Sequence, residues 1–355
     1  MFRVGGLAVV AAALMVGCSS RSGEVSTIPL APVASSTSSS TTAVSTSTTL
    51  GVTESLSAEA AVYLSAALDV MREFSINRNS VDWAMVEESA FRAAAAAETP
   101  AGTYAAIRLS LNHLNDEHSL FLTPAQAESF QHGEAVFTTP VVEIRSDDLG
   151  YVSVGRYLGD IGGQADEYAA DLAAQIDSLA GNVCGWIMDL QSNTGGNMWP
   201  MLAGVAPLLT PGAVGAFTYP DGTTETWENT GTVAIWDDTA MTANSRPNPK
   251  YEGLPVAVLI SSHTGSSGEA VAIAFHGQEE SRFFGQPTAG LTTSNEPVEL
   301  SDGAIIALTM SNFTDRLNRQ YGQNTPIEPD HTTAGFTESE NSAVEWLHNQ
   351  PICSP

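Results

Sequence analysis

Two segments of this chain share one pattern, and that pattern restricts the fold more than any other feature. In each segment a short apolar run ends in a turn that contains glycine, and a helical apolar pattern follows the turn. The segments read IMDLQSNTGGNMWPML from residue 187 and VAVLISSHTGSSGEAVAIAF from residue 256. Buried strands that alternate with helices are typical of α/β proteins. The sequence therefore predicts an α/β core.

A helical region precedes this core. Apolar residues at helical spacing predict three helices, over residues 56–74, 80–97 and 103–115. After Pro124 the pattern changes, and short β-branched runs alternate with helical segments. We therefore expect an N-terminal helical subdomain over residues 54–124 and an α/β core over residues 125–355.

The N-terminus has the features of an export signal. Arg3 precedes a short apolar run over residues 7–16, and Met15-Val16-Gly17-Cys18 resembles a lipobox, in which the signal is cut before the cysteine and the cysteine is acylated. An ordinary secretory signal or a single membrane helix is the alternative, but the run is shorter than the roughly 20 apolar residues that a spanning helix needs. We expect residues 1–18 to be a lipoprotein signal. The protein would then be extracytoplasmic, anchored to the cell membrane by lipidated Cys18.

Residues 19–53 are rich in Ser and Thr and have no period that would bury one face, so we expect a flexible linker. Disulfides persist outside the cytoplasm. With Cys18 acylated, Cys184 and Cys353 remain and could pair. Cys184 lies in an apolar strand-like run and could simply be buried instead. The sequence leaves both interpretations open.

The charge of the chain excludes some partners. The chain has 40 acidic and 13 basic residues, for a net charge of −27. Such a charge repels nucleic acid and anionic membrane surfaces, so we expect no nucleic-acid partner and membrane contact only through the lipid anchor. Neutral or cationic partners are favoured.

Three short segments are candidates for chemistry. Ser266 and Ser267 stand where an apolar strand ends and a helix begins, so nearby backbone N–H groups are free to hold an oxyanion. The commoner role of such a serine is a helix N-cap. Gly195 and Gly196 form a similar turn, which could expose N–H groups or simply be tight. His118 is a candidate general base, or a favourable charge at a helix C-terminus.

Together these segments resemble the C-terminal processing, or tail-specific, proteases and their relatives, the tricorn core protease and interphotoreceptor retinoid-binding protein. The resemblance extends from about Tyr104 to Asp330, and its motifs occur in order. They are Asp116-Glu117-His118-Ser119, Gly150 to Val154, Asp189 to Gly196 with Gln191 in place of an arginine, Ser266-Ser267-Gly268-Glu269, Gly285 to Gly290, and Ile327 to Asp330.

The resemblance implies a crotonase-like α/β spiral core and a serine peptidase that works through an acyl-enzyme. It implies that Ser266 is the nucleophile, with Ser267 as the alternative. The oxyanion hole would be the backbone N–H groups of Ser267 and of Gly195 or Gly196. The substrate would be a peptide or protein, and no cofactor is expected.

The chain departs from this family in its general base. The tail-specific branch uses a lysine directly after the P-T-x-G element, where this chain has Leu291, and the whole chain has one lysine, Lys250. A histidine base remains, and His118 is favoured over His263. The tricorn-like branch orients its histidine with a carboxylate that is missing here. The possible orienting or assisting residues are Gln323, Asp315, Glu328, Asp330 and Ser119.

A second departure concerns substrate selection. Tail-specific proteases usually carry a PDZ domain between the His-Ser element and the Gly-Tyr strand, where this chain has only residues 124–149. That interval is far too short for one. The missing lysine and the unassigned third residue also favour an alternative function, a non-catalytic module that binds a peptide or hydrophobic ligand on the same fold. Neither a metal-ligand spacing nor a phosphate-binding loop is evident.

Overall fold

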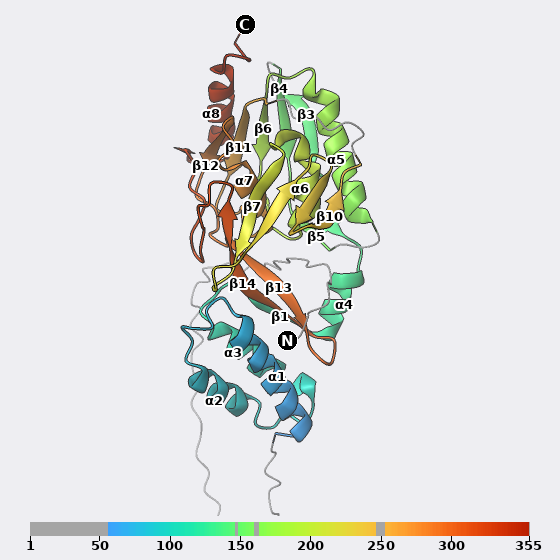
Figure 1. Ribbon diagram of the computed structural model, residues 1–355, viewed down its shortest axis with the longest axis vertical. Helices are drawn as coiled ribbons and strands as arrows, with labels where there is room; N and C mark the ends of the chain where they lie inside the picture. Colours follow the sequence, from blue (N-terminus) through green and yellow to red (C-terminus); the bar gives the residue numbers. More distant parts are fainter. Residues whose placement is uncertain (1–55, 146–147, 160–162, 246–252, 355) are drawn as a thin grey trace, which may run out of the picture.

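Figure 1 shows the computed structural model of the chain, which describes residues 56–145, 148–159, 163–245 and 253–354. The predicted lipoprotein signal with Cys18, the whole of the predicted linker, and Lys250 lie outside the described residues. The helices and strands confirm a mixed α/β fold.

Four helical segments gather at one end of the molecule (Figure 1): α1 (Ala58–Phe74), α2 (Trp83–Ala93), η1 (Pro100–Thr103) and α3 (Tyr104–Asn112). The Ser57 hydroxyl caps α1 and the Asp82 carboxylate caps α2, each by accepting a backbone N–H of the first turn. The second helix ends four residues earlier than the expected residue 97, and η1 follows it. Side chains such as Leu64, Met71 and Ile107 make the shared core of these helices.

A six-stranded sheet forms the centre of the α/β core, with the order β15-β12-β11-β6-β4-β3. All neighbouring pairs are parallel except β3 with β4. The strands are β3 (Val141–Arg145), β4 (Leu149–Ser153), β6 (Gly185–Asp189), β11 (Val256–Ile260), β12 (Ser281–Gly285) and β15 (His331–Thr332).

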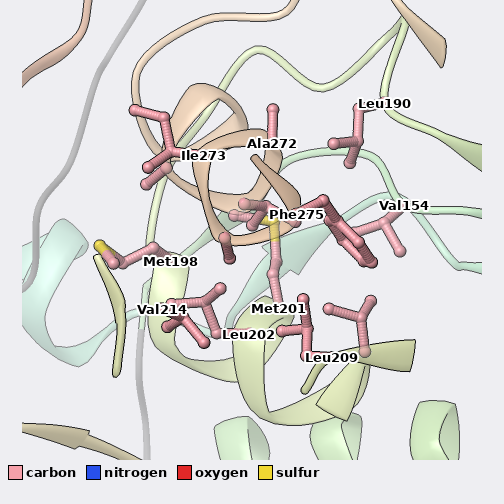
Figure 2. Packing of buried hydrophobic residues seen from close by; sticks show 14 of the residues in the cluster. Val154, Leu190, Met198, Met201, Leu202, Leu209, Val214, Ala272, Ile273 and Phe275 are labelled. Atoms are coloured by element: carbon pink, nitrogen blue, oxygen red, sulfur yellow. The ribbon is translucent and has the colours of Figure 1, made fainter. Parts of the chain in front are cut away.

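Helices cover both faces of this sheet, which explains the unbroken apolar sequence of β11. On one face, α8 (Phe336–His348) packs Ala343 and Leu347 against Ile187 and Leu259. The other face packs against α5 (Gln164–Ala180), α6 (Met198–Gly204) and α7 (Ser267–Phe275). Figure 2 shows Ile273 and Phe275 of α7 and Met201 of α6 among the buried side chains of this core.

An antiparallel sheet of seven strands connects the core to the helical end. Its order is β1-β14-β7-β8-β9-β10, and β13 pairs with β14 as well. The strands are β1 (Leu120–Leu122), β7 (Gly212–Thr218), β8 (Thr224–Asn229), β9 (Val233–Trp236), β10 (Thr239–Ala243), β13 (Thr293–Glu299) and β14 (Ile305–Asp315). Strand β14 packs Ile306 and Leu308 into the helical core and Phe313 into the α/β core, so it belongs to both.

The remaining elements are short: α4 (Pro124–His132), β2 (Val136–Phe137), β5 (Tyr157–Leu158) and η2 (Ala206–Leu208). The described residues between β1 and β4 form only α4, β2 and β3, and no PDZ domain is evident there. A disulfide joins Cys184 to Cys353 across 169 positions of sequence, with Cα atoms 5.0 Å apart. The pairing that the sequence left open is therefore present. No helix among the described residues is long and apolar enough to cross a membrane.

Candidate active site

Ser266 lies in the turn that joins β11 to α7, directly before the first residue of the helix. Its backbone has φ 53° and ψ −121°, on the positive-φ side that L-residues rarely adopt, so the conformation is strained. The residue is only 3% exposed. This turn holds the hydroxyl at the N-terminus of a buried helix, where the helix dipole favours negative charge.

The carboxylate of Glu269 holds this turn in place. It accepts hydrogen bonds from the Ser266 backbone N–H at 2.8 Å, the Gly290 N–H at 2.9 Å and the Thr288 hydroxyl at 2.5 Å. Burial raises the pKa of the Glu269 carboxyl to about 7, and the three donors act in the opposite direction. Glu269 thus connects the Ser266 turn to the loop that follows β12.

His118 lies in the segment between α3 and β1 and contacts Ser266. Its Nε2 lies 2.9 Å from the Ser266 hydroxyl, although the two residues are 148 positions apart in sequence. The histidine follows α3, and the Asp116 carboxylate accepts the backbone N–H groups of His118 and Ser119. The Asn295 amide donates to the His118 carbonyl at 2.5 Å. These bonds fix the backbone from which the imidazole projects.

The other ring nitrogen of His118 contacts a residue that sequence reasoning missed. Nδ1 lies 2.8 Å from the hydroxyl of Thr293, on β13. Burial lowers the pKa of the His118 imidazole to about 4. At neutral pH the ring is therefore uncharged, as a general base requires. No motif in the sequence around Thr293 predicts this contact. Thr293 is 175 positions from His118 in the chain, and only the tertiary structure brings the two residues together.

The glycine turn lies directly against the serine. Gly195 and Gly196 have φ angles of 103° and 116°, so both use conformations that glycine tolerates best. A Cβ on Gly195 would lie 2.9 Å from the Ser266 Cβ, and a Cβ on Gly196 would lie 1.8 Å from the Tyr157 carbonyl oxygen. The Ser267 hydroxyl donates to the Gly196 carbonyl. Glycine is thus required for the close approach of this turn to α7.

Two backbone N–H groups near Ser266 have no acceptor among the residues that the structure describes, those of Ser267 and Gly196. The Ser267 group belongs to the first turn of α7, where no intrahelical acceptor exists. The Gly195 N–H differs, because it donates to the Asn193 side-chain oxygen at 2.9 Å. The buried donors beside the hydroxyl are therefore Ser267 and Gly196.

A family comparison matches residues 148–333, more than half of the chain, to the peptidase family S41. The chain belongs to peptidase family S41. This finding confirms the resemblance to the C-terminal processing proteases that the ordered motifs indicated.

One curated relative of this S41 chain is the nisin-resistance protein of Lactococcus lactis subsp. lactis. It is 29% identical over 288 residues, which are 81% of this chain and 87% of the relative. A lipoprotein from Streptococcus agalactiae has a similar structure, with a TM-score of 0.68 and 23% identity over 82% of this chain and 97% of that one. The photosystem II D1 C-terminal processing protease has a TM-score of 0.55 and 14% identity, over 78% of this chain and 94% of that one. These two structures show the α/β peptidase fold.

The other residues predicted for this S41 site do not contact the His118 ring. The Ser119 hydroxyl donates to Asp116 at 2.9 Å and so supports the turn before β1. Gln323 accepts a hydrogen bond from the Asn77 amide at 3.1 Å. His263, the alternative base, is exposed, and its ring lies beside Phe336.

The predicted carboxylates also lie elsewhere. Asp315 is 2.9 Å from Nδ1 of His276, a different histidine. Asp330 accepts the Phe283 backbone N–H at 2.9 Å, and Glu328 is exposed. Thus, within the described residues, Nδ1 of His118 bonds the hydroxyl of Thr293 and none of the sequence-based candidates for an orienting residue. No group of three or more metal-ligating side chains occurs within the described part of the chain.

Proposed function

We propose that this S41 protein is an exported serine peptidase in which Ser266 is the nucleophile and His118 the general base. The observation that carries the proposal is the 2.9 Å hydrogen bond between the Ser266 hydroxyl and Nε2 of a buried histidine. This is the distance at which a base can take a proton from a hydroxyl. The serine stands on a strained strand-to-helix turn beside unpaired N–H groups.

The reaction follows from these positions. Ser266 Oγ attacks the carbonyl carbon of a peptide bond while His118 Nε2 takes the hydroxyl proton. The N–H groups of Ser267 and Gly196 donate to the negatively charged oxygen of the tetrahedral intermediate. His118 then gives its proton to the leaving amine, which leaves an acyl-enzyme. Water, deprotonated by the same nitrogen, hydrolyses the ester and regenerates the hydroxyl.

We further propose a peptide substrate and a location outside the cytoplasm. The nisin-resistance relative makes nisin the first peptide to test. A net charge of −27 favours cationic peptides through long-range attraction, which salt weakens. The disulfide between Cys184 and Cys353 supports an oxidising compartment. A lipid on Cys18 would retain the protein at the membrane, and a Cys18→Ala variant should then lose membrane association.

A binding role without catalysis is the second candidate. The observation that favours it is the partner of His118 Nδ1, which is a hydroxyl and not a carboxylate. A hydroxyl stabilises the imidazolium less than a carboxylate does, so the base is weaker.

Labelling with a fluorophosphonate probe separates the two candidates. The parent protein should label, and Ser266→Ala and His118→Ala variants should not, while mass spectrometry should find cleaved nisin with the parent alone. Ser178→Ala serves as the control, because Ser178 is an exposed serine on α5 whose hydroxyl bonds the Gln175 carbonyl of the same helix at 2.7 Å, so this variant should still label. A folded parent that neither labels nor cleaves peptides would favour the binding role.

A further inference from the structure

The Thr293 hydroxyl is the only hydrogen-bond partner of His118 Nδ1 within the described residues, at 2.8 Å. Thr293 is 1% exposed and His118 is 7% exposed, so water does not readily replace either partner. A buried N–H without an acceptor is costly. The identity of residue 293 therefore bears directly on the protonation state of the ring.

The geometry restricts which tautomer of His118 can act. Neutral imidazole has one N–H donor and one acceptor nitrogen. If Ser266 donates its proton to Nε2, Nε2 must be the acceptor and the N–H must be on Nδ1. That N–H then donates to the Thr293 oxygen. Without this acceptor, the tautomer with the proton on Nε2 would gain in population, and it cannot take a proton from serine.

We propose that Thr293 is a positioning residue that holds His118 in the tautomer able to accept the Ser266 proton, in the place where related arrangements use a carboxylate. The inference rests on the proposed function of His118 as the base. Thr293 touches the base and not the substrate, so it acts through His118.

Strand β13 attaches the histidine at two points. Thr293 and Asn295 are two positions apart on this strand, and a register shift in the pairing with β14 lies between Ser294 and Asn295. The first contacts the ring and the second donates to the His118 carbonyl at 2.5 Å. Strand β14 supports both residues, since Thr293 pairs with Asn312 and Asn295 with Thr309. Ring and backbone are thus held by one rigid element, which limits rotation of the imidazole.

The test compares three variants of the full-length protein. Thr293→Val keeps the shape of the side chain and removes the acceptor, so fluorophosphonate labelling should slow about tenfold to a hundredfold. Thr293→Ser keeps the hydroxyl and should label within about threefold of the parent. Thr314→Val is the matched control: Thr314 is a buried threonine on β14 whose hydroxyl bonds Thr218 at 2.7 Å, and its loss should leave labelling unchanged.

A second measurement separates positioning from a general loss of structure. Nitrogen-15 spectra of the histidines, with His118 assigned by a His118→Gln variant, report which ring nitrogen carries the proton. The parent and Thr293→Ser should show the proton on Nδ1, and Thr293→Val should shift it toward Nε2. The proposal is overturned if Thr293→Val labels at the parent rate, or if its His118 keeps the proton on Nδ1.

Failure of the proposed function would look different. In that case the parent itself would not label, or Ser266→Ala would still label. The tautomer spectra do not depend on activity, so they decide the role of Thr293 in either case.

Discussion

Single residues at this site are held in conformations or protonation states that they would not adopt in isolation. Ser266 has a positive φ, which is held by the Glu269 carboxylate through the Ser266 N–H. Burial lowers the pKa of His118 to about 4, so the ring stays neutral at acidic pH values where an ordinary histidine is protonated. Strain and desolvation cost free energy, and such costs are common at functional sites because they prepare groups for reaction.

The requirement for glycine at position 196 can be tested directly. Gly196→Ala should abolish labelling and destabilise the protein by several kcal/mol, because its Cβ would lie 1.8 Å from the Tyr157 carbonyl oxygen. Gly212→Ala is the matched control: its φ of 110° is close to that of Gly196, but no atom lies within 4 Å of the new Cβ. For the control, thermal unfolding should show a loss of about 1 kcal/mol of stability, and labelling should be normal. Equal losses in the two variants would argue against the steric explanation.

The pH dependence of labelling reports His118. The ring must be neutral to accept the serine proton, and its pKa is lowered to about 4. Protonation of His118 should therefore reduce labelling as the pH drops through about 4, separately from any change near pH 7, where the Glu269 carboxyl protonates. An ordinary histidine would produce the same loss near pH 6.5. Circular dichroism at each pH would identify unfolding. A midpoint near 6.5 that persists in a folded Glu269→Gln variant would contradict the buried, neutral ring, because that variant lacks the Glu269 carboxyl.

At the level of elements, the site forms where the helical end meets the α/β core. Ser266 comes from the β11–α7 turn and His118 from the segment between α3 and β1. Strand β1 pairs with β14, and the tip of the β13–β14 hairpin contacts α1 and α3. There the Asp302 carboxylate accepts hydrogen bonds from the hydroxyls of Tyr63 at 2.7 Å and Tyr104 at 2.5 Å. The hairpin therefore connects the two parts that supply Ser266 and His118.

Asp302→Ala tests this connection. Loss of both tyrosine bonds should lower stability by about 2 kcal/mol and slow labelling, because the helical end that carries His118 would be held less firmly. Asp221→Ala is the matched control, since Asp221 also precedes a glycine in a hairpin turn but accepts hydrogen bonds from Thr223 of the same turn. Thermal unfolding and labelling rates of the two variants should differ. Similar behaviour would show that the tyrosine contacts do not support the site.

At the scale of the whole molecule, the C-terminal end of the described chain is tied to the central sheet. Helix α8 covers one face of that sheet, and the disulfide joins Cys353, beyond α8, to Cys184, directly before β6. A cross-link over 169 positions removes much conformational freedom from the unfolded chain. The disulfide thus stabilises the fold without contacting Ser266 or His118.

Replacement of both cysteines by serine should lower the free energy of unfolding by about 4 kcal/mol, as expected for a long loop. Denaturant unfolding with and without a reducing agent measures this, and the parent should approach the variant only when reduced. Labelling of the folded variant should match the parent. An unfolding midpoint that does not change on reduction would show that the disulfide contributes nothing to stability.

The sequence by itself determined the α/β class, the peptidase family and the serine at a strand-to-helix turn, because these depend on local periodicity and on motifs within short segments. The pairing of Cys184 with Cys353 and the Thr293 contact needed the tertiary structure. So did the position of His118: its motif was readable, but its 2.9 Å approach to Ser266 depends on the β1–β14 pairing. The family resemblance points to an acidic residue near the late Pro-Asp motif, whereas the partner of the ring is a threonine on β13. A hydrogen bond between residues 175 positions apart leaves no periodic trace in the chain, since only the packing of separate elements brings them together.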